Sequence, residues 1–456
     1  MEGLKTYMYK LVGCLKALNV KYRFSFIIFI FFLIFSPPII PQINTAIIAT
    51  MVAAGLLVTK YRTDVIKAFE KMKMNKFIIV MGIFFAYVAV VAFVNIFIVG
   101  EKIQLMHYIK LGYRFFLIIP ILLICVLYIC IRSKELNYSI YNLAMCFVIA
   151  TMIQFLLVLV ALLFPSIKEL FVSIIYANTG DAYLDIPWVM ERRGFGFCNS
   201  FVDSFGFGMG IIACLPLFFV KKHNWKVIYF VPCLIFVSLV NVRTGIVMAG
   251  MGLVVSIPII VSEFIRAERF YKIKAIKTIA ISIGVLLLLL ALVALCNRNT
   301  LKWIMGDFSS VIEATVPGTE EIVINIETDS QTTTADTLFS DRFWNIPPIT
   351  TFIFGSGHTI YGAEGYPNSD VGYINDLWLG GVIGCALLYG AFAGLFARAY
   401  KSAEDKNIKL LVVYFALAIL VFQIKANAIM FNAGLNTIIP ILFYICYYRG
   451  EKNDFQ

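Results

Sequence analysis

Residues 275–296 read AIKTIAISIGVLLLLLALVALC, an apolar run whose single charge, Lys277, lies near its start. No proline interrupts the residues that follow. About 20 such residues in an α-helix cross the roughly 30 Å of hydrocarbon in a bilayer. Because a helix satisfies its own backbone polar groups within lipid, this run predicts a membrane-spanning helix.

Runs of the same kind recur along the whole chain, and twelve of them are candidate spans. They predict an all-α polytopic membrane protein that forms a single integral membrane domain over residues 1–456. The pairs that flank Pro41 and Arg243 have a second interpretation, in which each pair is one broken hairpin. The candidates cover approximately residues 24–40, 43–59, 77–99, 111–131, 140–164, 201–220, 227–242, 244–261, 275–296, 371–397, 408–424 and 428–447.

The composition excludes a water-soluble enzyme. Of the 456 residues, 61% are hydrophobic and 14% are charged, and the mean hydropathy is +0.88, whereas soluble globular domains carry about 25% charged residues. The net charge of +11 does not favour nucleic acid as a partner, because the cations are dispersed between apolar segments. The ten cysteines form no CxxC or His-rich spacing, so they are interpreted as small apolar side chains.

The connections between the candidate spans alternate in charge, and this alternation predicts the orientation. Cytoplasmic loops of membrane proteins are enriched in Lys and Arg. With a cytoplasmic N-terminus, the cytoplasmic segments hold 27 of the 38 Lys and Arg residues. Twelve spans with both termini in the cytoplasm follow, since the loss of one span would invert every later loop. These segments are the N-terminal arm and residues 60–76, 132–134, 221–226, 266–277, 398–409 and 449–452.

Two connections on the opposite, external side are much longer than a turn. The first long external loop, residues 165–200, contains Glu191-Arg192-Arg193 followed by Gly194-Phe195-Gly196. The large external loop, residues 297–370, carries ten acidic and three basic residues. Its residues 321–328 alternate weakly in hydrophobicity, which is typical of a short strand. Both loops face the same side, where we expect the functional site.

The candidate spans hold almost no carboxylates away from their outer ends, where Asp203 and Asp376 are found. Ion-coupled transporters need protonatable or cation-binding groups near the middle of the membrane, so this pattern argues against a pump. Glycine recurs in the span at 371–397. This pattern indicates either close helix packing, which we favour, or the close approach of a lipid tail.

Arginine recurs at the external rim of the predicted bundle, against the general charge bias. A guanidinium group pairs with two phosphate oxygens at once, so several converging arginines would suit a pyrophosphate head group. The alternative is snorkelling at the interface or pairing with the acidic loop. Arg243 lies in a one-residue turn, where there is little structural reason for a charge, so we favour a functional role for it. For Arg114 the two interpretations are equally supported. The rim residues are Arg114, Arg192, Arg193, Arg243 and Arg342.

Two residues are candidates for a general base that activates a hydroxyl group. His358 lies in Gly355-Ser356-Gly357-His358, and histidine is a frequent base near neutral pH, although a lone histidine in a glycine-rich loop is more often structural. Asp370 competes for this role, and its alternative is to cap the helix that follows. Neither long loop contains a DxD or ExD pair that would hold a divalent metal ion. We therefore expect a reaction without metal or other cofactor, using a pre-activated lipid-linked donor.

Three segments resemble the bacterial O-antigen and capsule polymerases of the Wzy type, which are related to the O-antigen ligases and have a C-type glycosyltransferase fold. The layout of about a dozen spans, with a large external loop before the last three, resembles that family as well. In the second segment Val242 precedes Arg243, where the family commonly has Ser or Thr. The segments are Arg192-Arg193-Gly194-Phe195-Gly196-Phe197; Asn241-Val242-Arg243-Thr244-Gly245; and Phe354-Gly355-Ser356-Gly357 followed by Ser369-Asp370-Val371-Gly372-Tyr373-Ile374 and Gly380-Gly381-Val382-Ile383-Gly384.

The resemblance implies a metal-independent glycosyltransferase of the bacterial cytoplasmic membrane, acting at its external face. It would transfer a growing glycan from undecaprenyl pyrophosphate onto a new lipid-linked repeat unit. Arginines would bind the departing pyrophosphate, and a carboxylate or histidine would take the proton of the acceptor hydroxyl. The expected partners are the lipid-linked repeat units, membrane lipid and a chain-length regulator protein, and no nucleic acid. The catalytic candidates are Arg243, Arg192, Arg193, Asp370 and His358, and the substrate-binding candidates are Arg114, Arg342 and Tyr373.

Two other functions stay open. An O-antigen ligase has the same fold and donor but hands the glycan to a lipid core. Ligases usually carry a His-Asn pair where this chain has Ser369-Asp370, which favours a polymerase. A flippase for lipid-linked oligosaccharides would also combine twelve spans with basic residues. It would place its cations inside a central cavity and would not need a long external loop.

Overall fold

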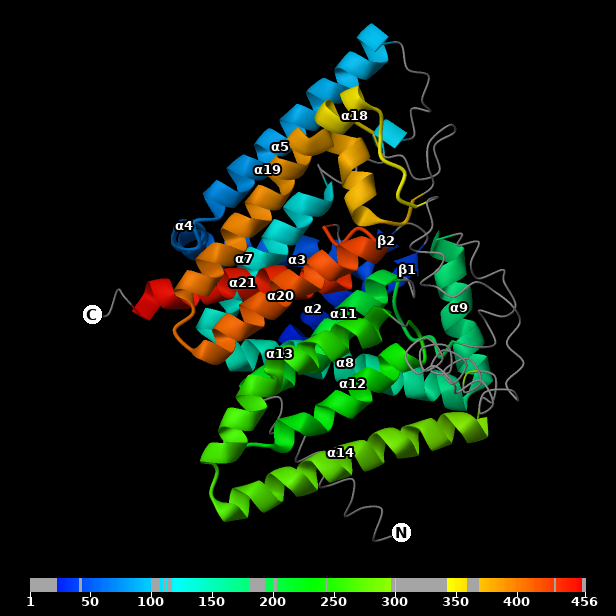
Figure 1. Ribbon diagram of the computed structural model, residues 1–456, viewed down its shortest axis with the longest axis vertical. Coiled ribbons are helices and arrows are strands. Elements are labelled where there is room, and N and C mark those ends of the chain that lie inside the picture. The colour runs from blue at the N-terminus through cyan, green and yellow to red at the C-terminus, as the bar shows by residue number, and fades with distance from the viewer. Residues whose placement is uncertain are drawn as a thin grey trace.

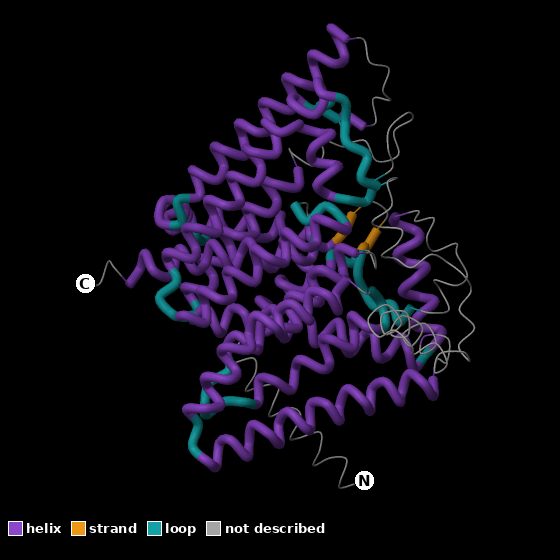
Figure 2. Tube along the Cα trace, viewed as in Figure 1, coloured by secondary structure: helices purple, strands orange, loops and turns teal. Residues whose placement is uncertain are grey.

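The computed structural model is a bundle of long α-helices (Figures 1 and 2). In the part of the chain that it describes, the only strands are β1 (Pro38–Ile40) and β2 (Ile43–Asn44), which pair antiparallel between two helices. The chain is an all-α polytopic membrane protein. The described residues are 23–40, 43–99, 107–109, 112, 117–179, 193–199, 203–242, 244–296, 300, 343–358, 369–429 and 432–452.

Within these ranges, six helices are long and apolar enough to cross a membrane. A seventh span results if α3 (Thr45–Thr59) and α4 (Arg62–Lys71), which are bent by 103° at their junction, are counted together. The six are α5 (Met74–Val94) with its π-helical continuation η1 (Asn95–Val99), α8 (Ile140–Leu163), α13 (Thr244–Arg266), α14 (Arg269–Cys296), α19 (Gly372–Ser402) and α20 (Lys406–Lys425).

The other described helices complete the bundle. Each of the twelve stretches predicted from hydropathy contains helical residues, but only six of the described helices are both long and apolar enough to count as full spans, so the count of twelve stays a prediction. The short helix α9 occupies the first part of the predicted external loop 165–200, whereas residues 321–328 lie outside the described residues. These helices are α2 (Phe24–Phe35), α7 (Ile119–Glu135), α9 (Pro165–Thr179), α11 (Asp203–Cys214), η4 (Leu215–Phe219), η5 (Lys226–Tyr229), α12 (Phe230–Leu239), α18 (Ile349–Phe354) and α21 (Ala433–Lys452).

The basic connections meet one another at one end of the bundle, which we call the basic end. In Figure 1, α4 and the turns that join α13 to α14 and α19 to α20 lie on the left, whereas β1, β2 and α9 lie on the right. One hydrogen bond joins two of these connections, from Arg398 Nη1 to Lys73 O (2.9 Å). The other contacts tie a connection to a neighbouring helix end: Lys60 Nζ to Glu135 Oε1 (2.7 Å), Lys222 N to Glu263 Oε2 (2.7 Å) and Lys134 Nζ to the Tyr447 ring (5.9 Å).

Glu135 at the basic end predicts an acid-sensitive contribution to stability. Burial raises the pKa of Glu135, but hydrogen bonds from Lys60, Tyr61 and Arg132 outweigh it and lower the pKa to about 2. A carboxylate with a lowered pKa stabilises the fold above its ordinary value of 4.5, and this contribution is lost as the pH falls from 4.5 to about 2. Because the side chain is 37% exposed, we expect the contribution to be less than about 1 kcal/mol.

Thermal unfolding in detergent checks this expectation. Glu135→Gln should lower the Tm at pH 7, and the difference from the unmodified protein should shrink below pH 4. Glu70→Gln, on an exposed position of α4, is the matched control and should leave the Tm unchanged at both pH values. A Tm of the Glu135 variant that equals the wild-type value at pH 7 would contradict the assignment.

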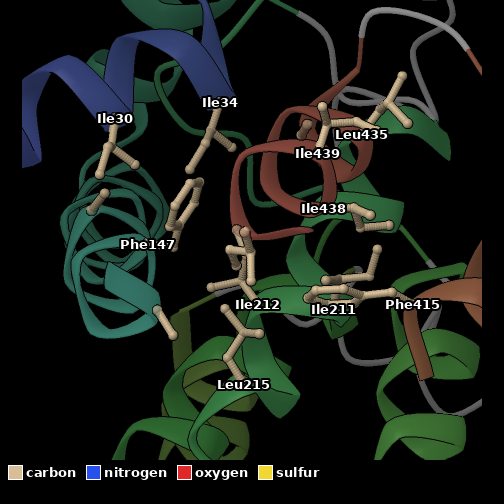
Figure 3. Close-up of a cluster of buried hydrophobic side chains, with 14 of the residues drawn as sticks. Ile30, Ile34, Phe147, Ile211, Ile212, Leu215, Phe415, Leu435, Ile438 and Ile439 are labelled. Atoms are coloured by element: carbon tan, nitrogen blue, oxygen red, sulfur yellow. The ribbon is translucent and has the colours of Figure 1, made fainter. Parts of the chain in front are cut away.

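Helix α11 crosses the middle of the bundle at close range because glycines face its neighbours. A β-carbon on Gly210 would lie 2.3 Å from the carbonyl oxygen of Gly245 in α13. A β-carbon on Gly208 would lie 2.4 Å from the β-carbon of Ala433 in α21. The backbones therefore touch, and apolar side chains fill the space around the crossing. Figure 3 shows some of these side chains: Ile211, Ile212 and Leu215 near α11, Phe147 on α8, Phe415 on α20 and Ile438 on α21.

Two glycines of α13 provide a matched test of this crossing. A β-carbon on Gly245 would lie 2.6 Å from Ser238 Oγ and 2.9 Å from the carbonyl oxygen of Gly206, whereas one on Gly250 would meet nothing within 4 Å. Gly245→Ala should therefore lower stability by about 1–3 kcal/mol through overpacking. Gly250→Ala should change it by less than about 1 kcal/mol. The Tm of the two variants in detergent measures the difference, and equal values would show that the crossing relaxes without cost.

Candidate functional site

Helix α19, predicted as one span at residues 371–397, is broken at Gly381. This glycine has φ +61° and ψ −169°, a backbone conformation that residues with side chains rarely adopt. A β-carbon there would lie 2.3 Å from the carbonyl oxygen of Ile353 in α18, so the close approach also requires glycine. The span therefore consists of a short half-helix, residues 372–380, and a long one that runs to the basic end (Figure 1).

The loop after α18 satisfies the carbonyl groups that the break releases. The N–H groups of Ser356 and Gly357 donate to the carbonyl oxygens of Trp378 (2.7 Å) and Leu379 (3.0 Å). The same loop is tied to the neighbouring span, because Asn95 Nδ2 donates to the carbonyl oxygen of Ser356 (2.7 Å). An unsatisfied backbone group costs several kcal/mol in lipid. Residues 355–357 therefore complete the broken span.

The short half-helix carries a buried carboxylate, Asp376, which is 4% exposed. Its Oδ2 accepts hydrogen bonds from the Tyr389 hydroxyl (2.7 Å) and from Gln423 Nε2 (2.6 Å). Its Oδ1 accepts one from Asn427 Nδ2 (2.9 Å). Asp376 and Tyr389 are 13 residues apart, a separation of about 20 Å in a straight helix. Their direct contact therefore depends on the break at Gly381.

Asp376, Tyr389, Gln423 and Asn427 form what we call the Asp376 cluster. The two amides are themselves held in place, because Gln423 Oε1 accepts from the N–H of Ala428 (2.6 Å) and Asn427 Oδ1 accepts from that of Ile429 (3.0 Å). A buried charge is stable only when its lone pairs are hydrogen-bonded. The cluster provides these bonds, and it fixes the half-helix to α20 and to the chain that follows α20.

An apolar groove lies beside the Asp376 cluster. The empty space here, open surroundings included, is about 870 Å³, and Asp376 and Asn427 line it. Its other walls are apolar side chains of α5, α7, α19 and α21, with Ile429 completing the lining. Small-molecule sites typically combine apolar walls with a few placed polar groups. The groove has apolar walls and two such polar groups.

Asp370 and Tyr373, two sequence candidates, lie on or directly before the same half-helix. Asp370 Oδ2 is 3.9 Å from Lys425 Nζ, and its side chain is 42% exposed. The Tyr373 hydroxyl donates to the carbonyl oxygen of Leu420 (2.8 Å). The alternative that Asp370 caps the helix is wrong, because the N-cap residue is Val371 and its N–H bonds to Ser369 Oγ (3.1 Å). The Asp370 carboxylate is thus accessible at the end of α20.

His358, the other candidate base, is fully buried in the loop that completes the break. Its ring lies 5.7 Å from the Tyr108 ring in an edge-on arrangement. The loop is pressed against the end of α5, since a β-carbon on Gly357 would lie 2.3 Å from the backbone nitrogen of Ala92. The structure therefore places His358 on the α5 side of α19, whereas Asp370 faces α20.

Arg193 begins a segment that lies directly on the turn before α13. The N–H of Gly194 donates to the carbonyl oxygen of Val240 (2.8 Å), and the N–H of Phe195 donates to Asn241 Oδ1 (2.8 Å). A β-carbon on Gly194 would lie 2.9 Å from Val240 Cγ2, so the glycine permits this contact. Two of the three family-like segments are therefore neighbours in space. Arg114, Arg192, Arg243 and Arg342 lie outside the described residues.

The sequence did not single out the Asp376 cluster. In the sequence Asp376 is only a carboxylate near the outer end of a span, and its partners are 13, 47 and 51 residues away. The available signal was the set of polar residues within or just after apolar runs, namely Asp376, Gln423 and Asn427. In the described ranges, no three His, Cys, Asp or Glu side chains lie close enough together to hold a metal ion.

Comparisons with models of protein families, with curated proteins and with solved structures found no match to this chain.

Proposed function

We propose that this protein is a polysaccharide polymerase of the Wzy type. It transfers a growing glycan from undecaprenyl pyrophosphate onto a new lipid-linked repeat unit at the external face of the bacterial cytoplasmic membrane. In this proposal the chain has twelve spans and a C-type glycosyltransferase fold, and the basic end faces the cytoplasm. The end that carries Asp370 and the Arg193 segment then faces outward.

The observation that carries the proposal is the contact between residues 193–195 and the turn at Val240 and Asn241. It supports the expectation that arginines from two separate parts of the chain act together. Arg192 directly precedes the first of these segments in the chain, and Arg243 directly follows Val242. Several guanidinium groups at one place would suit two linked phosphates, each of which accepts paired hydrogen bonds.

The proposed reaction is a displacement at the anomeric carbon of the donor sugar. An acceptor hydroxyl oxygen forms the new bond to that carbon while the bond to the pyrophosphate oxygen breaks, and the electron pair leaves with the pyrophosphate. Arg192, Arg193 and Arg243 stabilise the charge that develops there. Asp370 takes the proton of the hydroxyl, since its carboxylate is partly exposed and therefore within reach of an external substrate.

The groove favours a polymerase or ligase over a flippase. A flippase has to pass a charged, sugar-bearing head group through the bilayer, which calls for a polar central cavity. The groove is instead lined by apolar side chains, with one carboxylate and one amide. Ser369-Asp370 stands where ligases usually have a His-Asn pair, and this favours a polymerase over a ligase.

The function is tested by deleting the gene from its bacterium and restoring it in a complemented strain. Surface glycans and extracted lipid-linked glycans are compared on gels. A collapse from a long ladder to single repeat units that still reach the surface is the expected result. Long chains that accumulate on the lipid carrier would indicate a ligase, and a loss of all surface glycan with the repeat units retained inside would indicate a flippase.

A further inference from the structure

Helix α14 lies at the edge of the bundle (Figure 1) and is the least buried of the six spans. Its 28 residues extend for about 42 Å, whereas the hydrocarbon of a bilayer is about 30 Å thick. The apolar run 275–296 is long enough to fill the hydrocarbon, so the turns before it lie at the level of the lipid head groups, at the basic end. These turns, residues 269–274, read RFYKIK and are strongly basic.

The segment that contains η5 lies alongside the start of α14, because two contacts join them. The His223 ring lies 4.5 Å from the Tyr271 ring in an edge-on arrangement. Further along both segments, the Thr278 hydroxyl donates to the Tyr229 hydroxyl (3.4 Å). The chain runs in the same direction in the two segments, over six residues in one and seven in the other. The two segments are therefore aligned side by side between these contacts.

Lys226 and Lys274 lie midway between the two contacts, one on each segment. Lys226 is three residues before Tyr229 in the 3₁₀-helix η5, so the two share one face of it. Lys274 is three residues after Tyr271 and four before Thr278, so it shares the face of α14 that makes both contacts. Two cations from neighbouring segments are thus placed at the same height, on surfaces that face each other.

The charges around these lysines favour a bound anion. Neither Lys226 nor Lys274 forms an ion pair within the ranges that the structure describes. Residues 221–226 and 263–277 carry eight basic side chains and two acidic ones, of which Glu263 already accepts a hydrogen bond from the backbone of the loop. The first turn of α14 contains no acidic residue, although the N-terminus of a helix carries a partial positive charge that favours anions. An anion between the two lysines would relieve their repulsion.

Exposed apolar side chains beside the lysines indicate that this anion belongs to a lipid. Phe270, one turn before Lys274 on α14, is 69% exposed, and Ile273 is 47% exposed. A soluble anion would leave both side chains uncovered. A phospholipid places its phosphate at the lysines and an acyl chain along Phe270 and Ile273, because the head groups meet the hydrocarbon at this level of α14.

We propose that Lys226 and Lys274 bind the head-group phosphate of an anionic phospholipid from the leaflet at the basic end, and that Phe270 contacts its acyl chain. Basic residues at this level of a membrane protein are attracted to anionic lipids. The site lies at the end of the bundle opposite Asp370 and the Arg193 segment. It is therefore separate from the proposed transfer reaction, and the bound lipid holds the exposed helix α14 against η5.

The test measures binding of radiolabelled phosphatidylglycerol to the purified full chain in detergent. Lys226→Gln/Lys274→Gln removes both cations. Its matched control is Lys67→Gln/Lys406→Gln, which removes the same charge from two exposed positions elsewhere at the basic end, on α4 and at the start of α20.

A second pair of variants tests the apolar contact. Phe270→Gln removes it, and Ile66→Gln, at a position of α4 that is 64% exposed, is its control. The Tm of each variant without added lipid shows whether the fold is retained.

We expect Lys226→Gln/Lys274→Gln to weaken binding of phosphatidylglycerol about tenfold or more, and its control to bind within about twofold of the unmodified protein. Phe270→Gln should also bind more weakly than Ile66→Gln. Unlabelled phosphatidylcholine with the same acyl chains and inorganic phosphate should both displace the label poorly.

Three results would overturn the proposal. Equal binding by the lysine variant and its control would remove the two lysines from any lipid site. Displacement by phosphatidylcholine as effective as by phosphatidylglycerol would show that the site does not recognise an anion. Displacement by inorganic phosphate at the same concentration would show that the lysines bind a soluble anion and not a lipid.

Discussion

Replacing Asp376 with leucine should destabilise the protein by about 2–5 kcal/mol, because buried donors lose their acceptor. The Tyr389 hydroxyl and the amides of Gln423 and Asn427 all donate to this carboxylate. Leucine would leave the Tyr389 hydroxyl and the Asn427 amide without this acceptor in an apolar region, whereas Gln423 Nε2 keeps its bond to the Tyr389 oxygen (3.0 Å); each unsatisfied donor costs about 1–3 kcal/mol. The measurement is the Tm of the purified variant in detergent, together with the amount of protein that remains monodisperse.

Two further variants make this expectation specific to the carboxylate. Asp376→Asn keeps one acceptor oxygen and almost the same volume, so it should lose less stability than Asp376→Leu. Asp405→Asn is the matched control, because Asp405 is the exposed N-cap of α20 and asparagine caps a helix as well as aspartate does. A Tm of Asp376→Leu equal to that of the unmodified protein would show that these donors find other acceptors and that the cluster does not hold α19 in its broken form.

Cells that produce the Arg243→Ala variant should lose nearly all long surface glycan while the protein level stays normal. Removing one group that stabilises a developing charge typically slows a reaction by about 100-fold to 1,000-fold. At such a rate, single repeat units would replace the long ladder on a gel. The double variant Arg192→Ala/Arg193→Ala should behave in the same way, because the segment it alters lies on the turn that precedes α13.

The control for this experiment is Arg266→Ala. Arg266 lies at the basic end, and its side chain is 71% exposed. Its Nη1 is 4.0 Å from Glu263 Oε1, and an exposed ion pair of this kind contributes little to stability. The Arg266→Ala substitution removes the same charge from a place far from the proposed site, so the glycan ladder should persist. Polymer of full length in the Arg243 variant, with protein present on an immunoblot, would remove the arginines from the proposed pyrophosphate site.

The class of fold follows from the sequence because it depends on local composition. A run such as residues 275–296 is apolar in every turn, so no other structure satisfies its backbone in lipid. The position of the basic connections at one end of the bundle could also be predicted from the sequence, because each connection carries its own charges. The resemblance pointed to residues 192–197 and 241–245, and the structure adds that the described parts of these segments touch.

The break in α19 could not be read from the sequence in the same way. Gly380-Gly381 lies within a continuous apolar run, and two glycines there are typical of close helix packing as well as of a break. The positive φ of Gly381 depends on Ile353, 28 residues earlier in the chain, whose carbonyl occupies the space that a β-carbon would need. The partners of Asp376 come together only after this break has formed, so a pattern within one helix does not predict them.

The order of residues around the break has a consequence for how the chain enters the membrane during synthesis. The donors that complete the broken span, Ser356 and Gly357, leave the ribosome before the carbonyl groups of Trp378 and Leu379 that they serve. The broken span is thus completed by a segment that precedes it in the order of synthesis, so no later part of the chain is needed to satisfy these two carbonyl groups.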